Sequence, residues 1–369
     1  MKNVKFIVDI MFLHLRIVYF FMKFRKVNVN KIVMLSRQSE KPSMDFLMLK
    51  DEILKQNPQA EVVMLNKMLH KNVKSIIGFY LHMYTQLFHM SNAYTIVVDT
   101  YCIPVSMFKH QKETKVIQIW HSAGAIKKFG LQTTGSAGGR GATISKAMRM
   151  HQNYDVIVSS SDAMIPHFAK AFGCREEQFV SIGLPRIDYL IHNEASLQEK
   201  IYAKYPQLKE KPVVLYVPTF RRNRGLHVNE FFEKFDYEKY HLVFKHDPLF
   251  KTPITDSRIL TIPEFSSLDL VTVADKVISD YSAISIEVCA LDKPLYLYLY
   301  DYDEYTSDVG VNIELKEELK DCVCMDADSL IACLDKEYPM DALLAFKHKY
   351  LAYTDGSVTS RLAKLCLRK

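Results

Sequence analysis

Short apolar runs alternate with amphipathic stretches along most of this chain. The runs have the length and β-branched content of strands, and segments between them, such as 45–56 and 162–172, have the apolar spacing of helices. Strands alternating with helices predict parallel sheets that are covered on both faces. The expected strands are Lys31–Ser36, Glu61–Leu65, Thr95–Asp99, Val116–Ile119, Asp155–Ser159, Phe179–Ile182, Val213–Val217, His241–Lys245, Ile259–Thr261, Lys276–Ser279, Leu295–Tyr300 and Val323–Met325.

A segment rich in Lys, Glu and Pro, residues 204–212, divides this alternation into two sets. The length of 369 residues agrees with two domains of ordinary size. We therefore expect an α/β protein with two Rossmann-like domains, residues 27–205 and 206–350, followed by a C-terminal helix in 351–369. Such domains bind ligands in a cleft outside the carboxyl ends of their strands.

The first 26 residues predict a separate amphipathic helix. The run is strongly apolar, but Asp9, His14 and Arg16 interrupt it, and a central Arg costs several kcal/mol inside a bilayer. We expect the helix to lie on an anionic membrane surface with its basic residues at the headgroups. The alternative is a helix docked on the protein itself. Residues 67–90 form a second segment in which basic and aromatic side chains alternate.

Charge and cysteine usage narrow the class of partner. The net charge of +6 is modest but concentrated near the N-terminus and among aromatics, which favours a phosphate-rich substrate or membrane lipid over a nucleic-acid groove. The seven cysteines include no Cys-x-x-Cys pair, which is typical of a reducing cytoplasm without a disulfide framework or structural zinc. The expected location is the cytoplasmic face of a membrane.

The most informative polar cluster is residues 279–287, between a predicted strand and a predicted helix. Asp280 and Ser282 are N-cap residue types, so a helix is expected to begin there with its unpaired N–H groups directed into a crevice. Such a helix end carries partial positive charge and suits a phosphate group. The alternative is an ordinary capped helix.

A second cluster places a histidine directly after a predicted strand. His121 follows Trp120, the only tryptophan, and Lys127 and Lys128 add positive charge nearby. A histidine at a strand carboxyl end can remove a proton from a hydroxyl near neutral pH. The alternative is a packed or surface histidine.

Three further clusters follow predicted strands. One carries Arg186 and Asp188, expected near the cleft, although a turn with a surface ion pair would give the same pattern. Another delivers Arg221 and Arg222, whose guanidinium groups match phosphate oxygens bidentately. The last carries His246. The five clusters together predict a cleft that holds a diphosphate with histidines on either side.

In chain order these clusters read Trp-His…Lys-Lys-x-Gly, Gly-x-Pro-Arg-x-Asp, Tyr-x-Pro-Thr-aromatic-Arg, Lys-His-x-Pro and Ser-Asp-Tyr-Ser…Lys-Pro…Tyr-Asp. From about residue 27 to 310 this series resembles the CDP-glycerol glycerophosphotransferase family of teichoic-acid enzymes. The resemblance implies a GT-B fold and a membrane-surface location. It also implies transfer of glycerol phosphate or ribitol phosphate from CDP-glycerol or CDP-ribitol to a hydroxyl of a lipid-linked acceptor.

The resemblance also assigns roles to individual residues. His121 matches the general base, and His246 matches a second essential histidine close to the donor pyrophosphate. Ser282 and the backbone amides after it, beginning with Ala283, match the donor-phosphate site. Glu287, one helical turn beyond Ser282, is a candidate for holding the donor ribose. We expect His121 to deprotonate the acceptor hydroxyl, which attacks phosphorus and releases CMP.

Two departures from the family pattern concern the acceptor and the donor site. The sequence His-Ser-Ala-Gly at 121–124 replaces the frequent His-Gly-Thr-Pro, and Ala283 replaces a second serine. No cofactor or metal is expected. Two other functions fit the residues: a GT-B glycosyltransferase that uses a nucleotide sugar, and a non-catalytic membrane-surface scaffold that keeps a decayed donor site.

Overall fold

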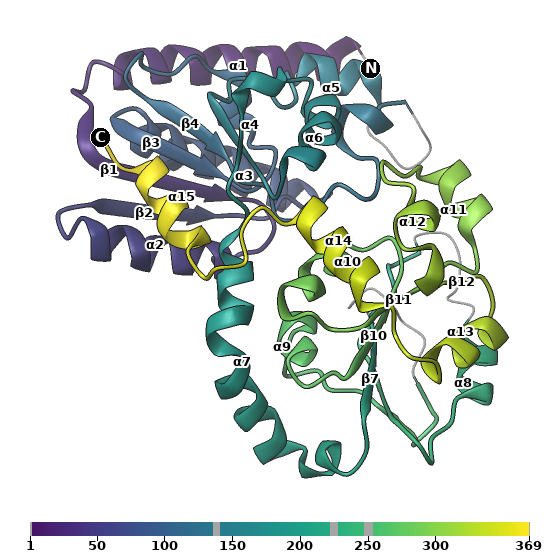
Figure 1. Cartoon of the computed structure of the whole chain (residues 1–369). Coiled ribbons are helices and arrows are strands. Elements are labelled where there is room, and N and C mark those ends of the chain that lie inside the picture. Colours follow the sequence, from purple (N-terminus) through teal and green to yellow (C-terminus); the bar gives the residue numbers. More distant parts are fainter. Residues whose placement is uncertain (1, 136–140, 222–227, 247–253, 369) are drawn as a thin grey trace.

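The computed structural model describes residues 2–135, 141–221, 228–246 and 254–368. Within them the chain forms two six-stranded sheets, and all paired strands in both are parallel. Helices cover the faces of each sheet, and the two sheets belong to two lobes of the molecule (Figure 1). The expected α/β architecture is confirmed.

The first sheet has the strand order β2-β1-β3-β4-β5-β6. Its order reverses between β1 and β3, so the crevice of this lobe lies at the carboxyl ends of those two strands. Every strand expected in the first half is present, with ends shifted by no more than a few residues. The strands are β1 (Asn28–Ser36), β2 (Glu61–Asn66), β3 (Ala93–Val98), β4 (Lys115–Gln118), β5 (Val156–Ser159) and β6 (Phe179–Ser181).

The second sheet has the order β12-β11-β10-β7-β8-β9, and its reversal lies between β7 and β10. The expected strands of this half are also present; β10 has the expected bounds, and the other five end one or two residues earlier than expected. The strands are β7 (Val213–Tyr216), β8 (His241–Phe244), β9 (Ile259–Leu260), β10 (Lys276–Ser279), β11 (Leu295–Tyr298) and β12 (Val323–Cys324).

Helices follow most strands, as crossover connections in parallel sheets require. In the first half they are α1 (Lys2–Met22), α2 (Met44–Gln56), α3 (Val73–Met90), α4 (Ile103–Met107), α5 (Ala142–Ala147), α6 (Ile165–Phe172) and α7 (Pro185–Lys204). In the second half they are α8 (Asn229–Lys234), α9 (Ser267–Val271), α10 (Ile284–Glu287), α11 (Tyr302–Asp308), α12 (Leu315–Glu318), α13 (Ala327–Leu334), α14 (Met340–Tyr350) and α15 (Val358–Cys366).

Helix α2 illustrates how the sequence sets these elements. The Ser43 side chain accepts a hydrogen bond from the Phe46 amide, which satisfies one unpaired N–H at the helix start. Phe46, Leu49 and Ile53 recur at helical spacing and are fully buried. This apolar stripe packs in the core beneath the first sheet, and α15 lies against the same helix.

The chain crosses between the lobes twice, through α7 and back through the segment from α14 to α15 (Figure 1). Asp188 joins the two crossings: its carboxylate accepts hydrogen bonds from the Val358 amide at 3.1 Å and from the Thr359 amide and hydroxyl at 2.7 Å. Helix α15 begins with unpaired N–H groups, and a buried carboxylate satisfies them. The expectation that Asp188 lies in the cleft is therefore wrong.

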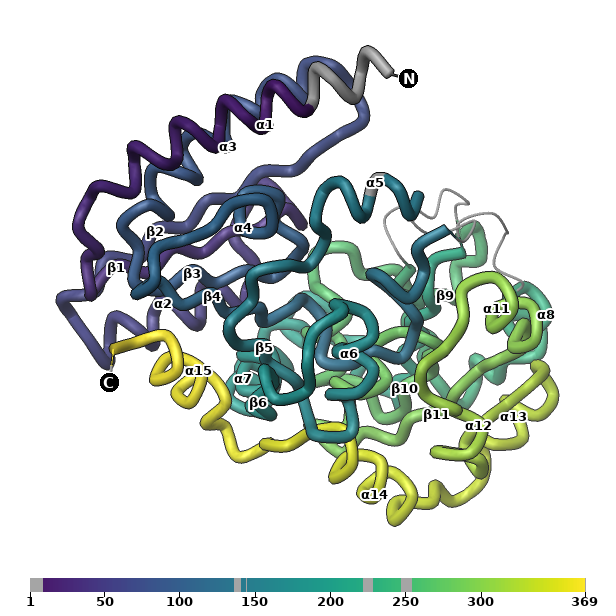
Figure 2. The backbone as a smooth tube through the Cα atoms, turned by 90° about the horizontal axis from the view of Figure 1, so that it is seen from above, coloured from purple at the N-terminus to yellow at the C-terminus, as the bar shows by residue number. Residues whose placement is uncertain are grey.

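Helices α1 and α3 lie side by side at the outer edge of the first lobe (Figure 2). Leu15 and Tyr19 of α1 are buried against the lobe, whereas the opposite side of α1 is exposed. The helix thus docks on the protein with one face only. Among the described residues, no helix is both long enough and apolar enough to cross a bilayer. The exposed large apolar side chains of the two helices and their flanks are Ile10, Leu13, Ile17, Phe20, Phe21, Phe24, Leu69, Val73, Ile76, Ile77, Leu81 and Phe88.

Replacing Asp188 by Ala should lower the free energy of unfolding by about 2 kcal/mol, because two amides at the start of α15 lose their acceptor. Chemical denaturation monitored by circular dichroism measures this change. Asp335→Ala is the matched control, since Asp335 forms an exposed pair with Lys239 and should change stability by less than about 0.5 kcal/mol. Equal effects of the two substitutions would contradict the capping role.

Candidate active site

A cavity of about 610 Å³ lies between the carboxyl edges of the two sheets. Its wall includes four of the residues expected near the cleft from the first lobe and three from the second. Parallel sheets place the loops after their strands at one edge, so residues far apart in sequence meet here. The seven are Trp120, His121, Lys127, Lys128, Arg221, Ser282 and Ala283.

The second lobe supplies a helix start at its strand-order reversal. Ala283 is the N-cap of α10 and makes no side-chain cap hydrogen bond, and the helix continues directly into a 3₁₀ turn, 288–291. The carbonyls of Ser282 and Ala283 accept the first hydrogen bonds of the helix. The amides at this start have no intrahelical acceptor, and both residues line the cavity. The expected helix start is present at the cavity, whereas the expectation that Asp280 or Ser282 caps it is wrong; anion binding there stays a prediction.

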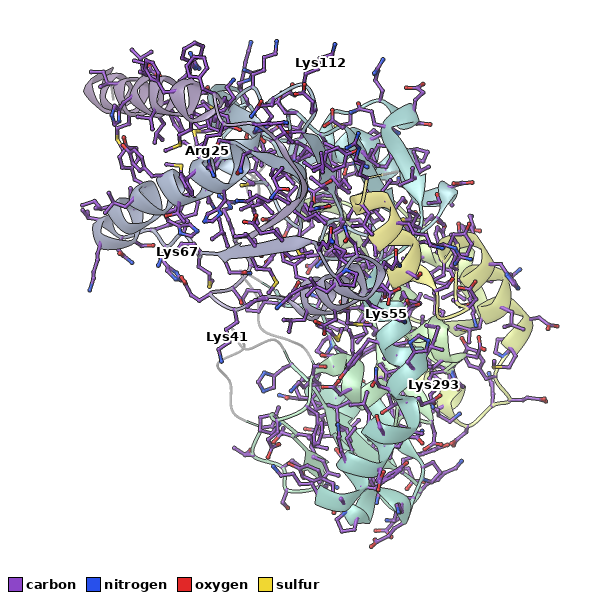
Figure 3. The ribbon with its side chains drawn as sticks, turned by 90° about the vertical axis from the view of Figure 1, so that its left-hand side faces the viewer. Arg25, Lys41, Lys55, Lys67, Lys112 and Lys293 are labelled. Atoms are coloured by element: carbon purple, nitrogen blue, oxygen red, sulfur yellow. The ribbon has the colours of Figure 1, made fainter. Side chains whose placement is uncertain are left out.

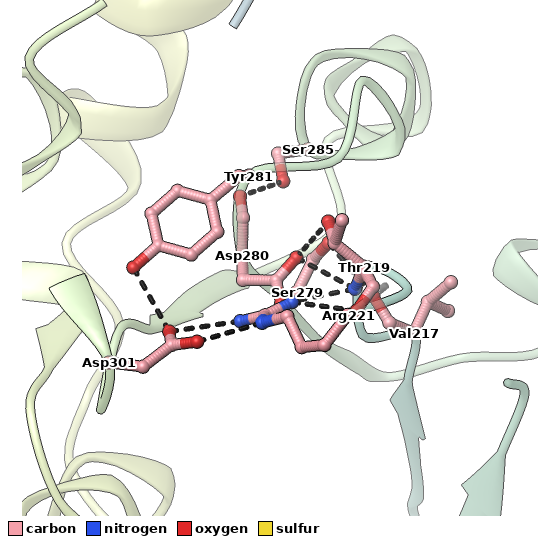
Figure 4. Close-up of polar contacts among 8 residues, drawn as sticks. All are labelled: Val217, Thr219, Arg221, Ser279, Asp280, Tyr281, Ser285 and Asp301. Carbon is pink, nitrogen blue, oxygen red and sulfur yellow. Dashed lines mark hydrogen bonds and ion pairs between the residues drawn. The ribbon is translucent and has the colours of Figure 1, made fainter. Parts of the chain in front are cut away.

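Asp280 is directed instead at the loop after β7 (Figure 4). Its carboxylate accepts from the amide and hydroxyl of Thr219 and from Nη1 of Arg221 at 2.8 Å. Asp301 accepts from Nε and Nη2 of Arg221 at 2.8 and 3.0 Å. Two carboxylates thus neutralise one guanidinium and raise its pKa further, despite the opposing effect of burial.

Arg221 is consequently a structural residue of the cavity wall, held by other side chains of the protein. Four of its five N–H groups donate to Asp280, Asp301 and the Thr219 carbonyl. Its guanidinium also lies 4.9 Å from the ring centre of Tyr305, which stacks on Tyr281 at 3.8 Å. The expected phosphate-binding fork is therefore largely occupied by protein. Its neighbour Arg222 lies outside the described residues.

The first lobe turns sharply after β4. Trp120 has φ of 60°, a left-handed conformation that is uncommon for a bulky residue. The Gln118 side chain accepts a hydrogen bond from the Trp120 amide at 2.8 Å, and the indole stacks on Phe129 at 4.7 Å. These contacts fix a strained turn, and strain of this kind is concentrated at functional sites. The turn brings His121 to the cavity wall.

The hydrogen bonding of His121 defines its tautomer. Nδ1 lies 2.9 Å from the carbonyl oxygen of Asp99, which can only accept, so Nδ1 carries the proton. Nε2 is then the basic nitrogen. Burial, together with the nearby Arg186 charge, lowers the pKa of His121 to about 4, although the hydrogen bond to the Asp99 carbonyl opposes both effects. The ring is neutral at pH 7 and able to accept a proton.

Asp99 itself was not among the expected site residues. Its carboxyl is buried, neither oxygen has a hydrogen-bond partner within the described part of the chain, and burial raises its pKa to about 7. It follows β3, at the strand-order reversal of the first sheet and next to the turn that holds His121. The signal in the sequence was an acidic residue directly after an apolar strand.

His246 is placed differently from His121. It follows β8, its ring lies 5.7 Å from that of Phe244, and it does not line the cavity. The next residues, 247–253, lie outside the described residues. The structure therefore brings His121 to the cavity wall but not His246, whose role stays a prediction.

Arg186 and Glu287 meet at the junction of the lobes. Nη1 of Arg186 lies 2.9 Å from Oε1 of Glu287, and Nε and Nη2 bind both carboxylate oxygens of Asp45 on α2. These carboxylates raise the pKa of Arg186. Arg186 thus lies at the junction of the lobes near His121, although neither it nor Glu287 is among the residues that line the cavity. The ribose-binding role of Glu287 stays a prediction.

The loop that follows His121 is attached to the second lobe. A Cβ on Gly124 would lie 2.2 Å from Cδ1 of Ile286 in α10, so a larger residue here would require the Ile286 side chain to shift. Further along, the Lys128 amide donates to the Gly310 carbonyl at 3.0 Å, and the Asn312 amide donates to the Ile126 carbonyl at 2.7 Å. The loop is thus joined by backbone hydrogen bonds to the segment 310–312 of the second lobe.

No three His, Cys, Asp or Glu side chains of the described ranges converge as metal ligands would. The polar groups at the cavity wall include an imidazole, two lysines, a helix start, the arginine that Asp280 and Asp301 neutralise, and the carboxylates of Asp301 and Asp308. They can hold an anion and accept a proton.

Gly124→Ala should destabilise the protein by about 1–3 kcal/mol, because the new methyl group overlaps a buried side chain. Ile286→Val removes the overlapping Cδ1 and alone should cost about 1 kcal/mol. The double variant should be less destabilised than the sum of the two by about 1 kcal/mol. Denaturant titrations of the unmodified protein, the two single variants and the double variant measure the coupling. Strictly additive changes in the free energy of unfolding would show that residues 124 and 286 are not in steric contact.

Comparison with known proteins places the chain among enzymes of one family. The family model for CDP-glycerol:poly(glycerophosphate) glycerophosphotransferase matches residues 17–368. The teichoic acid ribitol-phosphate primase of Bacillus spizizenii is 28% identical over 360 residues, covering 91% of this chain and 90% of the relative. The teichoic acid glycerol-phosphate primase of Bacillus subtilis (strain 168) is 27% identical over 292 residues, covering 76% and 75%.

A solved structure gives the same fold. The wall teichoic acid polymerase TagF, in a His-to-Asn variant soaked with CDPG, superposes with a TM-score of 0.76. The superposition covers 99% of this chain and 95% of that chain at 18% identity. This likeness confirms the expected GT-B type of fold. Because the family model extends over nearly the whole sequence, the chain belongs to the CDP-glycerol:poly(glycerophosphate) glycerophosphotransferase family.

Proposed function

We propose that this protein transfers a polyol phosphate, glycerol phosphate or ribitol phosphate, from a CDP-polyol to a hydroxyl of a lipid-linked teichoic-acid acceptor and releases CMP. Membership of the family supports the reaction class. The observation that carries the proposal is the cavity wall, where a neutral histidine of one lobe faces an uncapped helix start of the other. Relatives named as ribitol-phosphate and glycerol-phosphate primases support both donors equally.

The donor diphosphate would lie against the start of α10. Its anionic oxygens would accept from the amides at Ser282 and Ala283, where the helix dipole favours negative charge. Lys127 and Lys128 would add positive charge from the opposite lobe, since both line the cavity. Arg222 and His246 follow the neighbouring strands β7 and β8, and we assign them to the same donor side.

The reaction itself needs positioning more than covalent help. The acceptor hydroxyl gives its proton to Nε2 of His121 and its oxygen bonds to the phosphorus that bears the polyol. The bond from that phosphorus to the bridging oxygen breaks, and CMP leaves with the electron pair. Donors already aimed at the diphosphate then stabilise the charge that develops, a contribution of about 3 kcal/mol for each such hydrogen bond.

The low pKa of His121 fits this role in the donor complex. Without substrate, burial and Arg186 keep the imidazole neutral. A bound diphosphate brings negative charge close to the ring, which favours the imidazolium and raises its pKa toward neutrality. The base thus gains proton affinity when the donor is in place.

The outer surface of α1 and α3 is suited to the lipid that carries the acceptor. Its exposed apolar side chains are far more extensive than single exposed residues on a monomer surface. Arg25 and Lys67 lie beside these helices (Figure 3), and Lys71 and Lys74 are near the start of α3. An apolar face with basic neighbours favours partial insertion into an anionic leaflet. We therefore propose peripheral attachment at the cytoplasmic membrane face through this surface.

The donor is identified by incubating the protein with a defined lipid-linked acceptor and, separately, CDP-glycerol, CDP-ribitol and a UDP-hexose. Mass analysis of the product should show addition of one or more polyol phosphates and equimolar CMP. A hexose-bearing product with release of UDP would indicate the glycosyltransferase alternative. No product with any donor would favour the scaffold alternative and refute the proposal.

His121→Asn should abolish transfer, because no base remains to take the acceptor proton, while calorimetry should give nearly unchanged CDP-polyol affinity. A reduction of kcat by at least about 100-fold is expected for the loss of a general base. His167→Asn, a partly buried histidine that does not line the cavity, is the control and should retain normal turnover. Near-normal turnover of the His121 variant would remove it from the mechanism.

Replacing Phe20, Phe21 and Phe24 together by Ser should sharply reduce sedimentation of the protein with phosphatidylglycerol vesicles, because three exposed rings leave the surface. The matched control replaces Met325, Met340 and Leu344, which are exposed on the second lobe, and should bind vesicles normally. Melting temperatures of both variants should stay close to that of the unmodified protein. Unchanged vesicle binding by the phenylalanine variant would argue against this surface.

A further inference from the structure

Arg186 stands at the point where four elements meet. It lies in the first turn of α7, and its guanidinium joins Asp45 of α2 in the first lobe to Glu287 of α10 in the second. Two residues later, Asp188 caps α15, which returns to the first lobe. The side chains of Asp45 and Glu287 are only 3% and 5% exposed. Buried carboxylates must be neutralised, so the pairing of Asp45 and Glu287 with Arg186 restricts the position of one lobe relative to the other.

Glu287 connects Arg186 to the helix start at the cavity, because it lies in the first turn of the same helix. Its amide donates to the Ala283 carbonyl, and both residues belong to the same helical turn. A shift of Glu287 therefore shifts Ala283, which lines the cavity. Ile286, the preceding residue, contacts Gly124, three positions after the histidine. The same short helix thus touches both the junction arginine and the loop of His121.

Resting on the function proposed above, we propose that the Asp45–Arg186–Glu287 cluster is a positioning device that holds the donor-phosphate helix at the correct distance from His121. Glu287 acts through Arg186 and does not touch the donor. The acceptor hydroxyl and the reacting phosphorus are supplied from opposite lobes, so their approach depends on the placement of one lobe against the other. A misplacement of about 1 Å is sufficient to slow such a reaction about 100-fold.

The proposal differs measurably from a ribose-binding role of Glu287. A ribose ligand would contribute to donor affinity, so its loss would weaken donor binding. A positioning residue would contribute to kcat, and so would its partner Asp45, which lies on the other lobe and lines no part of the cavity. The behaviour of Asp45 therefore separates the two roles.

The test compares Glu287→Gln, Asp45→Asn and Glu264→Gln. The first two should each lower kcat by about 10–100-fold while the calorimetric Kd for CDP-glycerol or CDP-ribitol stays within about threefold. Glu264 forms an exposed pair with Lys204 at the opposite end of α7 from Arg186, and its variant should behave like the unmodified protein. Weakened donor affinity with normal kcat in Glu287→Gln, or normal kcat in Asp45→Asn, would overturn the proposal.

Two further measurements keep the result decisive. Arg186→Lys retains the charge but cannot reach both carboxylates with a planar fork, so it should lower kcat even if Asp45→Asn fails to fold. Hydrogen exchange of the amides of 283–291 should accelerate in Glu287→Gln and Asp45→Asn and not in Glu264→Gln. This readout needs no turnover, so faster exchange without any CDP-polyol activity would reject the proposed function and leave the positioning role standing. Unchanged exchange would reject the positioning role.

Discussion

The arrangement of the site depends on a positive charge held at the junction of two lobes. The guanidinium of Arg186 is shared by Asp45 and Glu287. Both carboxylates are buried, so water cannot replace the arginine as their partner. Separating the lobes would leave at least one buried charge unpaired, which is costly in a medium of low dielectric constant. Two further contacts join the lobes: Gly124 approaches Ile286 closely, and backbone hydrogen bonds form near Gly310. Charge neutralisation and steric fit thus favour one relative placement of the two sheets.

Two of the three arginines predicted near the substrate, Arg186 and Arg221, are instead bound by carboxylates of the protein, and the third, Arg222, lies outside the described residues. Arg221 is enclosed by two carboxylates and aromatic rings, and Arg186 is divided between the lobes. Each arginine connects carboxylates of different segments through ion pairs of fixed geometry, for which the planar guanidinium is well suited. Among the described residues, Lys127 and Lys128 also line the cavity, and their flexible stems would let them follow a phosphoryl group in the proposed reaction. Arg186 and Arg221, in contrast, are held in place by the carboxylates that they bind.

The fold was largely predictable because strand-forming runs are local signals. Every expected strand exists, and polar clusters after those strands do line a shared cavity at His121, Ser282 and Ala283. What could not be predicted was the partner of each charged side chain. Asp188 and Glu287 have the sequence context of site residues, but one satisfies a helix start and the other an arginine, and both partners are more than 90 positions away. Pairing across such separations is set by tertiary packing, which local patterns do not encode.

The electrostatics of His121 show why positioning dominates here. A histidine with a pKa of about 4 is a weak base toward water, and a surface imidazole would hold a proton more tightly. In the proposed reaction its advantage would arise only when a diphosphate occupies the helix start of α10, because that charge would stabilise the imidazolium at the moment when it forms. The benefit would fall with distance, since Coulomb energy varies as the inverse of distance and water between the groups screens it. In the proposed mechanism, a cluster that fixes the separation of the two lobes would therefore control both the alignment of the reacting atoms and the strength of the base.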